Sequence, residues 1–105
     1  MTLSDLKQAL ALAVDNVWRY TAPDNASVPY CVWAEDSRRD FEADGKHAEI
    51  AWQGTIDYYT RNEDDSAVDE IEDCLTNLDC AWYLNSIQHE QDTGVIHYEW
   101  VFTIG

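Results

Sequence analysis

The residues best suited to proton transfer or metal binding are three histidines, His47, His89 and His97. Alternate side chains of a strand share a face, so we expect His97 to lie beside Glu99, with Glu49 of another strand able to approach them. A metal site needs several ligands that converge at fixed distances. No histidine here has the helical i, i+4 spacing or a C-x-x-C partner that fixes such a site locally. We therefore expect surface histidines, no bound metal and no cofactor.

Two acidic runs, Glu63-Asp64-Asp65 and Glu72-Asp73, could suggest calcium binding or paired-carboxylate catalysis. A calcium-binding EF-hand loop needs alternating oxygen ligands, a central glycine and a distal glutamate, and the first run lacks this series. Acidic residues are also favoured at the positive end of a helix dipole. We interpret the first run as the solvated start of a helix and the second as its exposed face.

Nucleophiles are present, but the sequence gives them no partner. Ser66 and Ser86 have no recognisable base beside them, and no glycine-rich phosphate loop exists. Cys31, Cys74 and Cys80 make an odd count without a C-x-x-C pair, which is typical of reduced and mostly buried thiols. We therefore predict no catalytic residues and no enzymatic activity.

Charge is the strongest signal in the composition. The chain of 105 residues has a net charge of −15, and none of its six basic residues follows Arg61. Such a field repels nucleic acid and anionic membrane. We expect one soluble domain over 1–105, because 46% hydrophobic residues supply a core, no run reaches a membrane span, and the first residues do not resemble a signal peptide.

The elements that must position these side chains follow from periodicity. Residues 2–17 and about 66–78 place apolar residues at helical spacing. Residues 28–34, 47–60, 81–88 and 95–104 alternate with period two, and 17–21 are compatible with a short strand. The long run 47–60 is the expected spine of the sheet. The order predicts an α+β two-layer sandwich, with a largely antiparallel sheet of four to five strands and two helices packed on it.

Five tryptophans occur in this small domain, four of them on expected strands. A two-layer core accounts for most of them. One or two are candidates for an interface, where tryptophan and tyrosine are enriched.

Several runs resemble one family in order and spacing. VPYCVW (28–33), DFEADGK (40–46) and GTIDYYT (54–60) resemble the "PPYIVY", "NFxADxK" and "xIELYT" segments of small tail-region proteins of Gram-positive siphophages and prophages. An acidic helix pattern at 69–75 and a "YEF"-like strand, YEWVF at 98–102, continue the match. The sequence departs from the pattern at Cys31, at Trp33 and in the turn at 22–27.

The resemblance implies a virion structural protein of the tail-terminator or head–tail joining kind. Such proteins close into a ring, commonly a hexamer, at the head-proximal end of the tail. For this chain, the resemblance implies that the partners are further copies of itself and the tail-tube and head-completion proteins. It implies neither sequence-specific nucleic-acid binding nor association with a membrane. We expect it in the host cytoplasm during assembly and then in the virion tail. An alternative is an acidic DNA mimic or inhibitor that binds a basic protein.

A subunit or tail contact is expected in the connection Glu35–Gly45, EDSRRDFEADG, where the strand pattern lapses. This loop is longer than a tight hairpin needs and ends in Asp44-Gly45, a strong turn signal. Arg38 and Arg39 are candidates to pair with carboxylates of a neighbour, since the guanidinium group binds them bidentately. Phe41 is the candidate apolar anchor.

Overall fold

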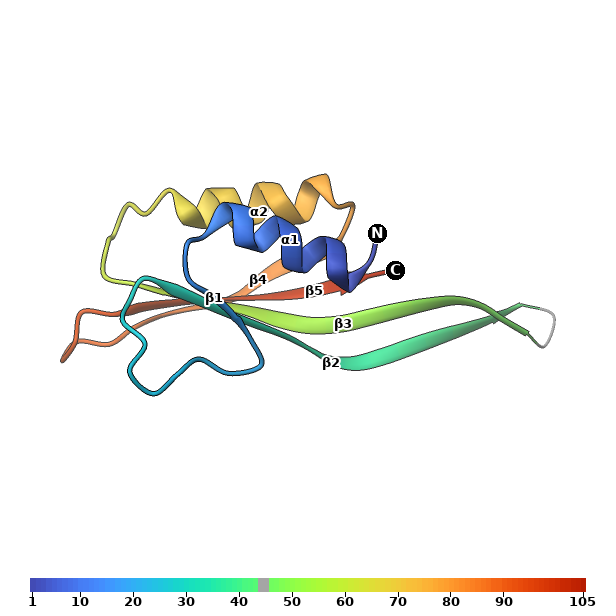
Figure 1. The fold of residues 1–105 in the computed structure, drawn as a ribbon, viewed down its shortest axis with the longest axis horizontal. Coiled ribbons are helices and arrows are strands. Elements are labelled where there is room, and N and C mark those ends of the chain that lie inside the picture. The colour runs from blue at the N-terminus through green and yellow to red at the C-terminus, as the bar shows by residue number, and fades with distance from the viewer. Residues whose placement is uncertain (44–45) are drawn as a thin grey trace.

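The computed structural model describes residues 1–43 and 46–105, and the side chains of 41–49 lie outside this description. Two helices and five strands follow one another along the chain (Figure 1). Their bounds are α1 Leu3–Ala13, β1 Val17–Arg19, β2 Tyr30–Ala43, β3 Lys46–Thr60, α2 Ala67–Asn77, β4 Ala81–His89 and β5 Ile96–Ile104.

The strands form one sheet in the order β1-β2-β3-β5-β4, with both helices on the same face (Figure 1). All neighbouring strands are antiparallel except β1, which runs parallel to β2. This confirms the predicted α+β fold, with two helices on a largely antiparallel sheet. The other face of the sheet carries no helix in the described part of the chain, and we call it the open face.

Strand β3 is the centre of the sheet, as its length and alternation predict. Ile56 and Tyr58 point under the helices and are buried, whereas Thr55 and Asp57, which alternate with them, face the open side. The core that these residues join includes two fully buried side chains of the neighbouring strands, Trp33 and Trp100. The remaining buried core residues are Leu6, Leu10, Val14, Cys31, Ile71, Leu75, Cys80, Phe102 and Ile104.

Helix α1 begins at a capping box and ends earlier than predicted. The Asp5 N–H donates to the Thr2 side chain, and the Thr2 N–H donates to the Asp5 carboxylate. The helix stops at Ala13, although the apolar spacing continues to Val17. Asp15 and Asn16 are weak helix formers, and Val17 is already the first residue of β1. Neither helix of the described residues is long and apolar enough to cross a membrane.

Helix α2 begins at a compact hydrogen-bond network around Asp65. One carboxylate oxygen accepts hydrogen bonds from the hydroxyls of Tyr58 (2.6 Å) and Thr60 (2.8 Å). The other accepts from the Ala67 N–H at 2.9 Å. The N-cap residue Ser66 makes no side-chain cap bond, so Asp65 fastens the start of α2 to the end of β3.

The prediction of a charged loop at 35–45 is wrong for most of these residues. Strand β2 continues to Ala43, and β3 already begins at Lys46. The Asp44-Gly45 turn itself lies outside the described residues. The strands continue because β3 supplies hydrogen-bonding partners up to the last residue of β2, with irregularities in register after Glu35 and after Phe41. A charged sequence without alternation can therefore form a two-stranded ribbon.

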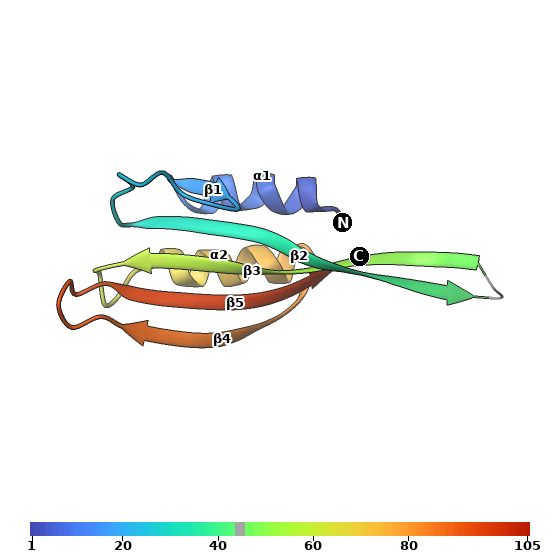
Figure 2. The same ribbon diagram turned by 90° about the horizontal axis from the view of Figure 1, so that it is seen from below.

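This ribbon extends beyond the rest of the sheet. The pairing of β3 with β5 begins at Trp52, opposite Ile104, so residues 46–51 have only β2 beside them. Figures 1 and 2 show the two strands projecting past the other elements. We call β2 from Ser37 to Ala43, with β3 from Lys46 to Ala51, the arm. It contributes to the elongated dimensions of 54 × 23 × 22 Å.

A pair of substitutions tests the orientation of β3. Ile56→Asp should lower the free energy of unfolding by about 4 kcal/mol or more, because it buries an unpaired charge. Thr55→Asp, on the open face, should cost about 1 kcal/mol. Urea denaturation of both variants measures the difference, and equal losses would contradict the orientation.

A second pair tests the start of α2. Asp65→Ala should cost about 2 kcal/mol, because two hydroxyls and one backbone N–H lose their acceptor. The matched control is Asp64→Ala, whose side chain is exposed, and it should change stability by less than about 0.5 kcal/mol. Thermal and urea unfolding of the two variants would give the comparison; similar values would show that the network is not needed.

Candidate functional site

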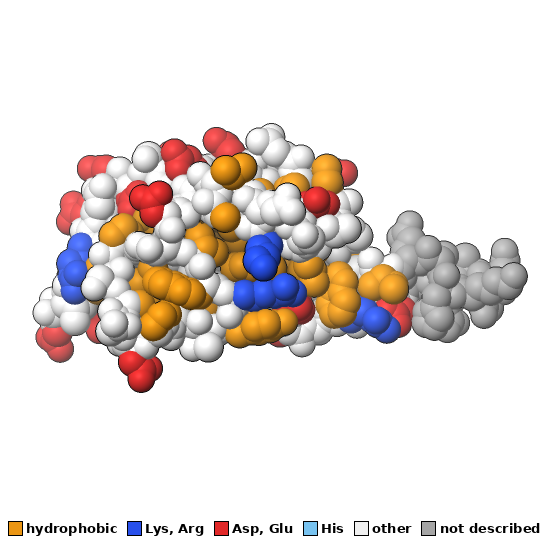
Figure 3. All heavy atoms as spheres, in the orientation of Figure 1, with side chains coloured by type: hydrophobic (Ala, Val, Ile, Leu, Met, Phe, Trp, Pro, Cys, Tyr) orange, Lys and Arg blue, Asp and Glu red, His pale blue; other side chains and the backbone are white. Residues whose placement is uncertain are grey.

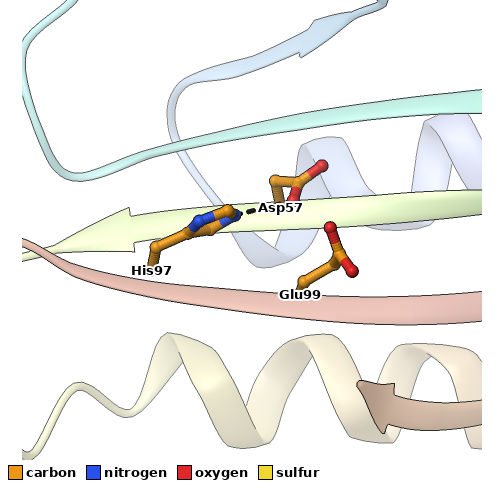
Figure 4. Close-up of side chains that lie close together, drawn as sticks. All are labelled: Asp57, His97 and Glu99. Carbon is orange, nitrogen blue, oxygen red and sulfur yellow. Dashed lines mark hydrogen bonds and ion pairs between the residues drawn. The ribbon is translucent and has the colours of Figure 1, made fainter. Parts of the chain in front are cut away.

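Asp57, His97 and Glu99 form a cluster at the centre of the open face (Figure 4). One ligand atom of each residue lies within 4.8 Å of those of the other two. Nε2 of His97 is 2.7 Å from Oδ1 of Asp57. All three side chains are partly buried. The cluster combines two carboxylates and one imidazole, the groups that bind protons and metal ions.

The register of β3 and β5 brings the cluster together. Asp57 lies directly opposite Glu99, and His97 lies opposite Tyr59. Sequence alternation correctly placed His97 and Glu99 on one face but gave them the wrong third residue. Glu49 pairs with Phe41 in the arm, ten residues from Tyr59, and an extended strand covers about 33 Å over that length. Asp57 is the acid that joins the histidine.

Neighbouring side chains orient both ends of the cluster. Nδ2 of Asn85, on β4, donates to Oε1 of Glu99 at 2.6 Å. The Tyr59 ring is stacked on the imidazole of His97 with centroids 4.3 Å apart, and Tyr30 stacks on Tyr59 at 4.8 Å. A strip of rings therefore crosses from β2 to β5 and covers one side of the histidine.

The environment disfavours charge on Asp57. Burial raises the pKa of its carboxyl above the usual value, and the nearby Glu99 acts in the same direction. The hydrogen bond to His97 and its positive charge oppose this effect without cancelling it. Like charges directly opposite each other in a sheet are destabilising. A bound proton or cation would relieve this conflict.

Acid–base catalysis explains this geometry less well than binding of a cation does. The hydrogen bond with Asp57 fixes the orientation of the imidazole, as in many catalytic dyads. A nucleophilic mechanism also needs a hydroxyl or thiol bonded to the histidine. Among the described residues, Asp57 is the one hydrogen-bond partner recorded for the His97 ring. Cys31 is not suited to be that nucleophile, because it is buried with the core side chains and burial raises its pKa to about 12.

The predicted contact residues lie in the arm and not in the cluster. Arg38 and Arg39 are exposed on β2, opposite Trp52 and Ala51. Arg38 forms an ion pair with Asp40 of its own strand at 2.9 Å, and its guanidinium lies 5.6 Å from the centroid of the Trp52 ring. The backbone of Phe41 belongs to β2, but its side chain lies outside the described residues.

The tryptophans divide between core and surface. Trp33 and Trp100 are buried, whereas Trp18, Trp52 and Trp82 remain partly exposed. The partly exposed rings lie on β1, on β3 at the base of the arm and on the edge strand β4. These three are the candidates for the predicted interface.

A hollow of about 810 Å³ lies between the end of α1 and the start of α2. Asp65, Thr60 and Tyr58 line part of it, and they already bond to one another. No buried side-chain nitrogen or oxygen among the described residues lacks a hydrogen-bond partner. Of the side chains of the hollow that could bind a ligand, Asp65, Thr60 and Tyr58 are therefore already used in holding the start of α2.

Comparison with known proteins adds no second line of evidence. No family model matches the sequence, and a search of curated proteins finds no match. Functional arguments for this chain therefore depend on its residues, its geometry and the resemblance of its motifs.

The raised pKa of Asp57 predicts a pH effect. The folded state holds this proton more tightly than the unfolded chain, so the stabilisation is complete below the unfolded-state pKa, about 3.9, and is lost as pH rises through the folded-state pKa. The stability of the wild type relative to Asp57→Asn should therefore fall from about pH 4 upward.

Urea unfolding in a chelator-containing buffer series measures this difference. Asp64→Asn, which changes an exposed acid outside the cluster, is the control and should show a flatter difference from the wild type. A difference for Asp57→Asn that stays constant or grows with pH would contradict the assignment.

Proposed function

We propose that this protein is a phage or prophage virion structural protein, a tail terminator or head–tail joining protein that assembles into a ring. The observation that carries the proposal is the uneven distribution of charge across the sheet. Residues 62–105, which form α2, β5 and the edge strand β4, contain eleven acidic residues and no lysine or arginine. The acids are Glu63, Asp64, Asp65, Asp69, Glu70, Glu72, Asp73, Asp79, Glu90, Asp92 and Glu99.

Basic residues concentrate at the other side of the sheet. Arg19 lies on β1, Arg38 and Arg39 on β2, and Lys46 on β3. Figure 3 shows acidic side chains along the side where the helices lie and also at the lower left of the molecule, with the visible basic ones level with the sheet. Residues 1–61 hold all six basic residues beside ten acidic ones, so this part of the chain is much less acidic than residues 62–105. Contact between its basic groups and the acidic part of another copy would be head-to-tail, and such a contact, repeated, gives a ring when its rotation closes.

The edge strand β4 lies in the acidic part of the sequence, carries no acidic residue itself, and suits the contact through its exposed edge. It has no strand on its outer side in the described sheet, and it carries neither proline nor a basic residue that would protect an edge; a register irregularity between Leu84 and Ser86 interrupts its regular pairing. Tyr83, Leu84 and Ile87 on this strand are all exposed, and Ile87 is 57% exposed. Apolar groups beside unpaired backbone N–H and C=O groups favour strand addition by another chain.

The arm is the proposed partner of the acidic side, through arginines that lie in a segment of balanced charge: Arg38, Arg39 and Lys46 are matched by Asp40, Glu42 and Glu49. It projects beyond the other elements of the fold, so a neighbouring copy could contact it, and it carries Arg38 and Arg39. Arg19 does not serve this purpose, because its guanidinium already binds Glu35 of the same chain. Nε donates to one carboxylate oxygen at 3.1 Å and a terminal nitrogen donates to the other at 2.6 Å. Arg39 has no ion-pair partner among the described residues, which leaves its guanidinium available to a neighbour.

An acidic ring also suits the passage of DNA. Phosphates bind to lysine and arginine, and like charge prevents them from adhering to an acidic wall. The alternative, an acidic inhibitor that imitates DNA, requires a basic protein partner and does not need the arm.

Complementation of a phage that lacks this gene tests the proposal. The triple variant Arg38→Glu, Arg39→Glu, Phe41→Ser should yield separate heads and tails, with the titre reduced at least 100-fold. The wild-type gene should restore joined particles. Electron microscopy of the lysates measures the outcome.

Two controls show whether a failure of the triple variant to complement reflects a lost contact. Lys7→Glu reverses an exposed charge on α1 and should complement normally. Circular dichroism must show that the triple variant folds. Normal infectious particles from a folded triple variant would exclude the arm as the contact. Joined particles without the gene, or a 1:1 complex with a basic nucleic-acid enzyme, would contradict the proposed function itself.

A further inference from the structure

We propose that Asp57, His97 and Glu99 form a binding site for a divalent transition-metal ion, of which Zn²⁺ is the best-fitting example, on the open face of the sheet. The proposal is independent of any role in a phage tail. It revises the expectation that the histidines bind no metal, because Asp57 enters from a strand that sequence spacing could not connect to His97.

The geometry fits an ion after a small adjustment. Zinc binds imidazole nitrogen and carboxylate oxygen at about 2.0–2.2 Å, so neighbouring ligand atoms are roughly 3.3 Å apart. The three ligand atoms here lie within 4.8 Å of one another, with His97 Nε2 and Asp57 Oδ1 at 2.7 Å. Rotation of the side chains, without movement of the strands, brings such a set to zinc distances. The metal would then replace the proton shared between His97 and Asp57.

The ligand types select the ion. Imidazole favours zinc and its neighbours in the first transition row, whereas Mg²⁺ and Ca²⁺ prefer sets made only of oxygen. Three protein ligands leave a fourth position open, as in sites where water completes the tetrahedron. The partial burial of all three residues limits competition from bulk water.

Neighbouring side chains hold the proposed ligands in position, as they do in known metal sites. Asn85 holds the Glu99 carboxylate through a 2.6 Å hydrogen bond, and the stacked Tyr59 ring fixes the plane of the imidazole. Such outer contacts orient ligands and raise metal affinity. Two carboxylates face each other across β3 and β5, and a divalent cation would neutralise their repulsion.

Isothermal titration of the full-length protein with ZnCl₂ is the direct test. We expect one site on the wild type, a higher Tm with zinc, and little effect of MgCl₂ or CaCl₂ at equal concentration. His97→Gln and Glu99→Gln should each weaken zinc affinity at least 10-fold. The matched controls, His89→Gln and His47→Gln, should leave it unchanged.

The cysteines are the competing zinc ligands, and cobalt distinguishes them. Cys74 and Cys80 lie at the end of α2 and just before β4. A Co²⁺ complex of the wild type should lack a thiolate charge-transfer band, and Cys74→Ser with Cys80→Ser should retain zinc binding. Absence of zinc binding, equal affinity in all histidine variants, or a thiolate band would each overturn the proposal.

Discussion

The structure depends on the requirement that β3 satisfy two different environments at once. Because its side chains alternate, a single register places Ile56 and Tyr58 under the helices and Asp57 and Tyr59 on the open face. A slip by one residue would put Asp57 into the apolar core and expose Ile56. The core therefore holds the ionisable cluster in place, although the two share no side chain. Asp65 extends the same constraint to α2, through the hydroxyls of Tyr58 and Thr60.

The two ends of β3 have different neighbours and different properties. From Trp52 onward the strand has a partner on each side and helices above it. Gly54 marks the crowded region of this half: a Cβ there would overlap the carbonyl oxygen of Ala34 and lie 2.8 Å from the Phe102 ring. Before Trp52 only β2 remains, and the ribbon leaves the sheet. One long strand thus connects a packed domain with a projection available to other molecules.

Sequence patterns predicted the parts of the fold that local periodicity determines. The alternation over 95–104 and the helical spacing over 66–78 led to β5 and α2 because burial on one face imposes each period. The arm was missed because EDSRRDFEADG shows no alternation, although its residues up to Ala43 belong to β2 and pair with β3. The cluster was missed in part for a different reason. Strand parity gave His97 and Glu99, but the identity of Asp57 depends on which residue of β3 lies opposite Glu99. Residues 40 positions apart in the chain carry no local signal of that register.

The bare edge of β4 has a consequence for the way copies of this chain meet. An edge strand with exposed Tyr83, Leu84 and Ile87 is attractive at contact distance. A net charge of −15 is repulsive beyond it, over a Debye length of about 8 Å at physiological salt. Random encounters between dilute copies are therefore slowed before the edges can pair. In the proposed ring, a scaffold that already holds several copies together would favour assembly, so nucleation, and not diffusion, would set when and where these chains associate.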